Sequence, residues 1–122
     1  MQHKNITDAI LGCSYDVINE LGCGFLESVY EAALCHLLNE RGFNVKLQHP
    51  IAVLFRGVCV GNFYADLLVE DTVIVELKSV KALCPEHQAQ LINYLQATGI
   101  EVGLLTNFGN QRLDVKRLTR SK

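Results

Sequence analysis

The chain has 122 residues, which is enough for one domain of ordinary size and short for two. Apolar residues make up 49% of it and charged residues 20%, as in an average globular domain, so collagen-like, low-complexity and disordered chains are excluded. Eleven Lys and Arg against 13 Asp and Glu give a net charge of −2. Bulk charge therefore favours neither nucleic acid nor a membrane as partner, although it leaves room for an enzyme that contacts DNA locally.

Compartment signals in the sequence predict a cytoplasmic protein with no membrane partner. No apolar stretch approaches the ~20 residues that a membrane span needs, and residues 1–5 lack the apolar core of a signal peptide. The five cysteines form no Cys-x-x-Cys motif, which leaves a zinc ribbon or a redox pair without a local signature. We interpret them as structural thiols, with Cys13 and Cys35 at apolar positions of helices.

Two helices joined by a short glycine turn are predicted at the start of the chain. Apolar residues recur at steps of three and four over 6–21, where Asn5 is the expected N-cap and Gly22 the expected end. The same spacing over 26–38 predicts the second helix, which ends at Gly42.

A change to short apolar runs, broken by Gly, Pro and acidic residues, predicts strands joined as hairpins over 45–55, 58–69 and 72–79. Pro85 begins a third helix, with His87 in a capping role, and Gly99 ends it. Two last strands are predicted over 102–106 and 113–118. Because no repeat, linker or shift in composition appears, residues 1–122 are predicted to form a single α/β domain.

Three charged residues, Asp66, Glu76 and Lys78, interrupt the otherwise apolar second and third strands. A buried carboxylate without a partner is costly, so each of these side chains needs a partner or a function. A three-residue loop over 70–72 sorts apolar from polar side chains onto two faces, and it places Asp66 opposite Glu76 and Tyr64 opposite Lys78. A two-residue loop would instead turn Glu76 to the other face, so we predict the three-residue loop.

Two carboxylates side by side repel each other when both are ionised, and a divalent cation relieves that repulsion. Hard oxygen ligands at this separation suit Mg²⁺ or Mn²⁺. Lys78 follows Glu76 by two residues and shares its face, where the ammonium can reach an activated water or a phosphate. Cation, water and ammonium together are typical of phosphodiester hydrolysis. A salt bridge from Lys78 to either acid, on a solvated sheet face, fits the spacing equally well.

Two motifs carry a resemblance to a known family. Residues 24–30 read Gly-Phe-Leu-Glu-Ser-Val-Tyr and match a G-x-x-E-x-x-Y pattern, and Asp66 followed by Glu-Leu-Lys at 76–78 matches a D…E-x-K pattern. The chain thus resembles the GxxExxY family of the PD-(D/E)XK nuclease superfamily over about residues 5–120. The resemblance implies a restriction-endonuclease-like αβββαβ core, with a mixed sheet flanked by helices and an extra helix at the N-terminal side.

The resemblance also implies a metal site. It assigns Asp66 and Glu76 as ligands of Mg²⁺, or of Mn²⁺ in its place, with the Leu77 carbonyl as a third ligand. Glu27 matches the helical acid that completes such sites. Read without the motif, Glu27 lies four residues before Glu31, and two acids at that spacing are also typical of a solvated helix face.

Further roles follow from the same resemblance. Lys78 would orient or deprotonate the attacking water, and Gln90 matches a glutamine that recurs beside this kind of active site. Tyr30 either hydrogen-bonds an active-site carboxylate or packs between helix and sheet. The chain departs from the superfamily pattern at Ala65, which stands where the pattern has proline.

The expected activity is Mg²⁺-dependent hydrolysis of phosphodiester bonds, with DNA as the favoured substrate. The alternative is a catalytically silent interaction module with the same fold that works through a protein or nucleic-acid partner. A nucleotide-binding or RNA-directed protein is less favoured because no glycine-rich phosphate loop is present. Five basic residues between 112 and 122, with Lys78 and Lys81, would form either a phosphate-binding strip or a soluble tail. The small size favours a homodimer or a partner protein.

Overall fold

The computed structural model describes residues 3–120, which form three helices and one five-stranded sheet. In chain order the elements are α1 (Lys4–Leu21), α2 (Glu27–Glu40), β1 (Val45–Phe55), β2 (Val58–Val69), β3 (Val73–Lys78), α3 (Pro85–Thr98), β4 (Val102–Asn107) and β5 (Asp114–Thr119). The predicted order is confirmed: α2 to β4 make the αβββαβ core, α1 is the extra helix, and β5 closes the sheet. Within these residues no helix combines the length and the apolarity needed to cross a bilayer.

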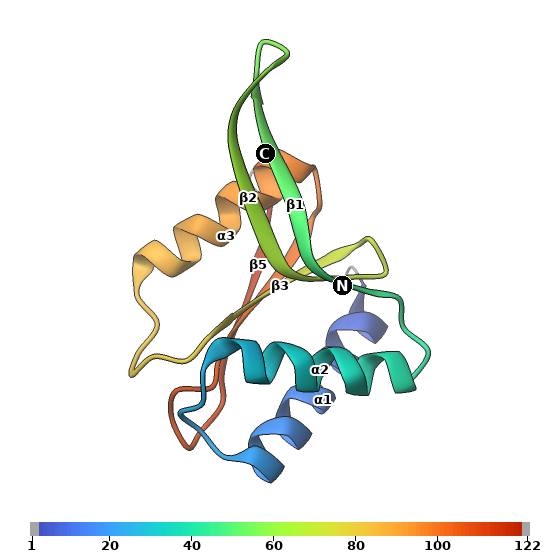
Figure 1. Cartoon of the computed structure of the whole chain (residues 1–122), viewed down its shortest axis with the longest axis vertical. Helices are drawn as coiled ribbons and strands as arrows, with labels where there is room; N and C mark the ends of the chain where they lie inside the picture. Colours follow the sequence, from blue (N-terminus) through green and yellow to red (C-terminus); the bar gives the residue numbers. More distant parts are fainter. Residues whose placement is uncertain (1–2, 121–122) are drawn as a thin grey trace.

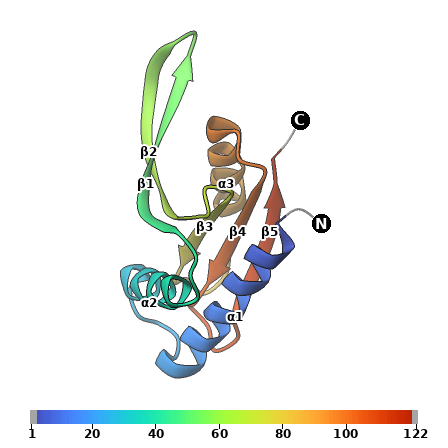
Figure 2. The same cartoon turned by 90° about the vertical axis from the view of Figure 1, so that its right-hand side faces the viewer.

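The strands lie side by side in the order β1-β2-β3-β4-β5 (Figures 1 and 2). The first three form antiparallel hairpins, β3 and β4 run parallel, and β5 returns antiparallel to β4. The parallel pair requires a crossover, which α3 supplies. The β1–β2 hairpin is much longer than the other strands and extends beyond the rest of the sheet (Figure 2).

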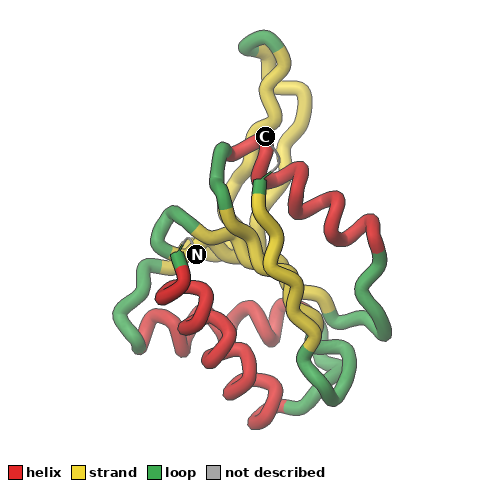
Figure 3. Tube along the Cα trace, turned by 180° about the vertical axis from the view of Figure 1, so that it is seen from behind, coloured by secondary structure: helices red, strands yellow, loops and turns green. Residues whose placement is uncertain are grey.

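Helices cover both faces of the sheet and divide the core in two (Figures 2 and 3). On one face, α1 and α2 pack against the sheet with Ile10, Cys13 and Leu34 fully buried. On the other, α3 packs through Leu91 and Leu95. Burial of Cys13 confirms its interpretation as a small hydrophobic residue. All five cysteines, each within the described part of the chain, are free thiols.

The N-terminal cap of α1 differs from the prediction, whereas that of α3 agrees with it. The N-cap of α1 is His3 and not Asn5, which lies inside the helix, and no side chain caps this end. The sequence signal failed because the helical backbone begins at Lys4, two residues before the apolar repeat that starts at Ile6. At the start of α3, the Cys84 N–H donates to His87 Nδ1 at 3.2 Å, so the predicted capping role of His87 is confirmed.

Tyr30 holds the turn between α1 and α2 against the end of β4. Its side chain is fully buried, and its hydroxyl donates to the Gly22 carbonyl at 2.7 Å and accepts from the Phe25 N–H at 3.0 Å. Its ring stacks on Phe108 with the centroids 4.5 Å apart. Of the two roles weighed from the sequence, packing is therefore the one that the structure bears out.

Replacing Tyr30 by phenylalanine should lower the free energy of unfolding by about 1–3 kcal/mol, because the Phe25 N–H and the Gly22 carbonyl lose a shared partner. Urea unfolding monitored by circular dichroism measures the change. The matched control is Tyr15→Phe, since that side chain is 49% exposed. Equal stability of the two variants would show that the Tyr30 hydroxyl does not hold the turn.

Candidate active site

Asp66 and Glu76 meet at the position where β2 and β3 separate. Regular pairing of the two strands ends at Leu67 with Val75, in the register of the predicted three-residue loop. Beyond that pair, the Asp66 N–H donates to Glu76 Oε2 at 2.7 Å, and the Leu77 N–H donates to Asp66 Oδ2 at 2.9 Å. Each carboxylate thus bonds to the neighbouring strand in place of a backbone carbonyl, and the two side chains are held next to each other.

The predicted pairing of Tyr64 with Lys78 was wrong. Tyr64 pairs with Pro50 of β1, and its side chain is 57% exposed. Lys78 pairs with Asn107 of β4. The physical reason is that β2 follows β1 into the long hairpin, which turns away from β3 just after the carboxylates (Figure 1).

Glu76 is a buried acid, only 4% exposed. Burial, and then the negative charge of Asp66, raises the pKa of its carboxyl, while the Asp66 N–H and the Lys78 ammonium lower it; the net result is a pKa of about 8. At neutral pH this carboxyl therefore holds a proton. A cation placed between the two acids would favour the ionised form instead.

Lys78 ends β3 and is fixed there by β4. Its carbonyl accepts from the Phe108 N–H at 2.8 Å, and the Asn107 side chain bonds both the N–H and the carbonyl of Val80 just beyond it. The Lys78 ammonium lowers the pKa of Glu76, yet within residues 3–120 it forms no ion pair with either strand acid. The simple salt bridge that the spacing also allowed is therefore not formed.

Helix α2 contributes a buried acid that the sequence analysis left on a solvated face. Glu31 is 9% exposed, and its Oε1 accepts from Gln48 Nε2 at 2.6 Å. The same amide nitrogen lies 3.3 Å from Asp66 Oδ1, so Gln48 bridges the two acids. Burial, and then the charge of Asp66, raises the pKa of Glu31, while the Gln48 bond lowers it. The spacing of four residues from Glu27 was the available signal for Glu31, and nothing in the sequence marked Gln48.

Glu27, the helical acid assigned by resemblance, begins α2 and is half-buried. Its negative charge contributes to the raised pKa of Glu31, one helical turn away. Among the described residues no hydrogen bond joins Glu27 to Asp66 or Glu76. The structure therefore links Glu31 to Asp66 through Gln48, and among the described residues no such hydrogen-bonded link reaches Glu27.

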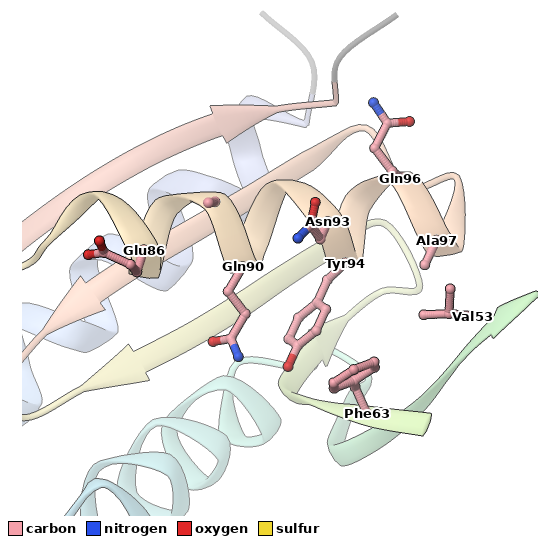
Figure 4. A pocket seen from close by; sticks show the side chains of 9 residues that line it. Val53, Phe63, Glu86, Gln90, Asn93, Tyr94, Gln96 and Ala97 are labelled. Carbon is pink, nitrogen blue, oxygen red and sulfur yellow. The ribbon is translucent and has the colours of Figure 1, made fainter. Parts of the chain in front are cut away.

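A cleft of about 720 Å³ lies between α3 and the β1–β2 hairpin, and neither Asp66 nor Glu76 is among the residues that line it. Gln90 and Tyr94 point from α3 to the same side, toward Phe63 of β2 (Figure 4). Burial, and then the charges of Glu76 and Asp66, raises the pKa of the Tyr94 phenol, which places this side chain within electrostatic reach of both acids. Gln90 itself is exposed in the cleft.

The oxygen atoms at the strand junction fit a Mg²⁺ ion better than a metal that needs many protein ligands. Within residues 3–120 no three His, Cys, Asp or Glu side chains are arranged to hold a metal together. Asp66 and Glu76, however, form a close pair of acids, one of them buried with a raised pKa. Mg²⁺ is usually bound by one or two carboxylates and keeps several waters, and its charge would stabilise this pair.

The basic residues near the end of the chain do not gather around the acids. Lys116 and Arg117 lie on β5, at the edge of the sheet, and Arg120 pairs with Glu101. Lys122, the last residue of the predicted strip, lies outside the described residues. Lys78 is separated from β5 by the whole of β4.

Strand topology, crossover helix and paired strand acids together define an α/β fold of the nuclease type. A family model described as the PD-(D/E)XK nuclease superfamily matches residues 4–118. The chain belongs to that superfamily, and its mixed five-stranded sheet with three described helices is the restriction-endonuclease-like fold.

Among solved structures, the chain is similar to that of SSO0001, with a TM-score of 0.58 and 15% sequence identity. The match covers 78% of this chain and 51% of SSO0001, so the chain spans about half the length of that protein. At this identity the likeness shows the fold alone. No curated protein matches the chain.

Proposed function

We propose that this protein is a Mg²⁺-dependent nuclease of the GxxExxY family that hydrolyses phosphodiester bonds in DNA in the cytoplasm. The observation that carries the proposal is the meeting of Asp66 with the buried Glu76 where β2 leaves β3. Lys78, on the same strand as Glu76, lies near enough for its charge to act on that acid. Membership of the PD-(D/E)XK superfamily makes hydrolysis of nucleic acid the activity that best uses these groups.

Asp66 and Glu76 would hold the cation through their carboxylates, with the Leu77 carbonyl as a third oxygen and Glu27 completing the site from α2. When bound, Mg²⁺ supplies Lewis-acid stabilisation of the charge that develops on phosphate oxygens, and Mn²⁺ could substitute for it. Gln48 would keep Asp66 oriented, since it ties that side chain to Glu31 on the helix behind it.

Lys78 would orient the attacking water through its ammonium or, as the neutral amine, take up the proton of that water. Its backbone is fixed on both sides, by Phe108 and by the Asn107 contacts to the following loop, which limits where the ammonium can move. Gln90 is exposed in the cleft and would contact the DNA backbone beside the scissile phosphate. The cleft between α3 and the β1–β2 hairpin would receive the strand to be cut.

A cleavage assay with plasmid and single-stranded DNA, in Mg²⁺ and in EDTA, tests the proposal. We expect cleavage only with the metal, and a loss of roughly 10²–10⁴-fold in Lys78→Met, as for other groups that transfer a proton. Lys81→Met is the matched control, because Lys81 is exposed on the loop just after β3. Activity that survives in EDTA, or that both variants lose equally, would contradict the proposal.

A silent interaction module with this fold is the second candidate, and one observation favours it. Each strand acid accepts a backbone N–H from the neighbouring strand, so each carboxylate has a structural role in joining β2 to β3 that does not involve catalysis. Titration with Mn²⁺ separates the two candidates. Binding that Glu76→Gln abolishes supports the nuclease, and no binding by the unmodified protein supports the module.

A further inference from the structure

The β1–β2 hairpin carries seven of the twelve large apolar side chains that are exposed in the described part of the chain. Six of them are not among the residues that line the cleft, and their exposed fractions are 50–64%: Leu47, Leu54, Phe55, Val58, Val60 and Tyr64. We propose that this part of the hairpin, here called the arm (residues 47–64), is the surface through which two copies of the chain form a dimer. This inference goes beyond the proposed nuclease activity and does not depend on it.

The arm lacks the cover that such side chains normally have. Figures 1 and 2 show that it extends past α3 and past the other strands, so its tip has no layer packed on either face. An irregular register between Val53 and Leu54 adds Val60 as an extra residue on β2. A two-stranded hairpin alone is marginally stable in water, and three or more strands are needed for a stable sheet. An added strand or an opposing face would supply that stability.

The chemistry of the arm fits protein and not DNA. Arg56 is the single charged residue between 51 and 64, and it lies over the Phe55 ring, with its guanidinium carbon 5.3 Å from the ring centroid. Binding to a nucleic-acid backbone depends on several Lys or Arg contacts to phosphates. With so few charges, two arms can face each other without like-charge repulsion, and an apolar patch of this kind marks a protein interface.

The exposed area matches what a dimer needs. The six side chains lie on both faces of the hairpin, because consecutive strand residues such as Leu54 and Phe55 point to opposite faces. Together they expose roughly 700 Å² of mostly apolar surface, so two arms that enclose each other on both faces would approach the ~800 Å² that each partner contributes to an interface of standard size. In addition, β1 is an edge strand, and its segment from Ile51 to Phe55 contains neither proline nor charge. Its unpaired edge can add to the β1 edge of a second copy across a two-fold axis, as closed dimers require.

Sedimentation equilibrium of the purified protein at up to about 100 µM tests the proposal. We expect a mass twice the 13.6 kDa of the chain. Leu54→Lys should weaken the dimer at least about tenfold, because two ammonium groups would be buried near the axis. Leu26→Lys, at a side chain that is 78% exposed before α2, is the matched control and should leave the dimer unchanged. Circular dichroism verifies that both variants are folded.

Thiol labelling gives a second readout that needs no substitution. Cys59 lies opposite Leu54 on the arm, Cys23 lies in the turn before α2, and both are exposed in the single chain. As concentration rises into the dimer range, maleimide labelling of Cys59 should slow several-fold while that of Cys23 stays constant.

A monomeric protein across the whole range would overturn the proposal, as would a dimer that Leu54→Lys leaves intact or that Leu26→Lys disrupts. None of these outcomes depends on cleavage.

Discussion

Asp66→Asn is expected to abolish metal-dependent cleavage while leaving the fold in place. The substitution keeps a side-chain oxygen that can accept from the Leu77 N–H, so the junction of β2 and β3 is preserved. It removes one of the two negative charges that would hold the cation. Because a metal ion contributes several kcal/mol to stabilising the transition state, the rate should fall by about three orders of magnitude or more.

Single-turnover cleavage in Mg²⁺ measures this loss, and thermal unfolding shows whether the variant is folded. Asp71→Asn is the matched control: this aspartate is exposed in the β2–β3 loop, where it pairs with Lys46, 2.7 Å away. We expect it to keep full activity. Equal activity of Asp66→Asn and the unmodified protein would remove Asp66 from the metal site.

Glu76→Gln should stabilise the metal-free protein at alkaline pH and hardly change it at pH 5. Burial holds the pKa of the Glu76 carboxyl near 8 in the folded chain, well above its ordinary value of 4.5. Below pH 4.5 the Glu76 carboxyl is protonated in both the folded and the unfolded chain, so its ionisation takes nothing from the free energy of unfolding. As pH rises toward 8, the unfolded chain releases its proton first, so the unmodified protein loses stability and the glutamine variant does not.

The difference should reach the order of 2–4 kcal/mol above pH 8, since each unit of pKa corresponds to about 1.4 kcal/mol. Urea unfolding in EDTA between pH 5 and 9 measures it. Glu20→Gln, at an exposed position of α1, should show no such pH dependence. Added Mg²⁺ should restore stability to the unmodified protein alone. If the difference in free energy of unfolding between the variant and the unmodified protein stays constant from pH 5 to 9, the pKa of Glu76 is not raised in the folded chain.

The order of the elements was predictable from sequence because each carries a strong local signal. Apolar residues spaced at three and four mark α1, whose buried positions include Ile10, Cys13 and Val17. The loop over 70–72 could be predicted because a register one residue different would turn Glu76 to the face opposite Asp66. Because each element carries several such signals, one wrong detail, such as the predicted N-cap of α1, does not change the predicted order of the elements.

The candidate site was predictable only in part, because its finer geometry depends on contacts distant in sequence. Asp66 and Glu76 stand out as charges within apolar strands. Gln48 does not: its role depends on a positive φ of 51° within β1, a rare conformation for a residue with a side chain. Glu31 reads as an ordinary surface acid until β1 is packed beside α2. Neither the separation of β2 from β3 nor the bulge in the arm has a signature in local residue pattern.

A crystal structure of the unmodified protein soaked in Mn²⁺ tests the central claim most directly. The account predicts anomalous density that contacts a carboxylate oxygen of Asp66 and one of Glu76, with the Leu77 carbonyl facing the same ion. Both acids free of density, each still bonded to the backbone of the opposite strand as in the metal-free fold, would contradict it.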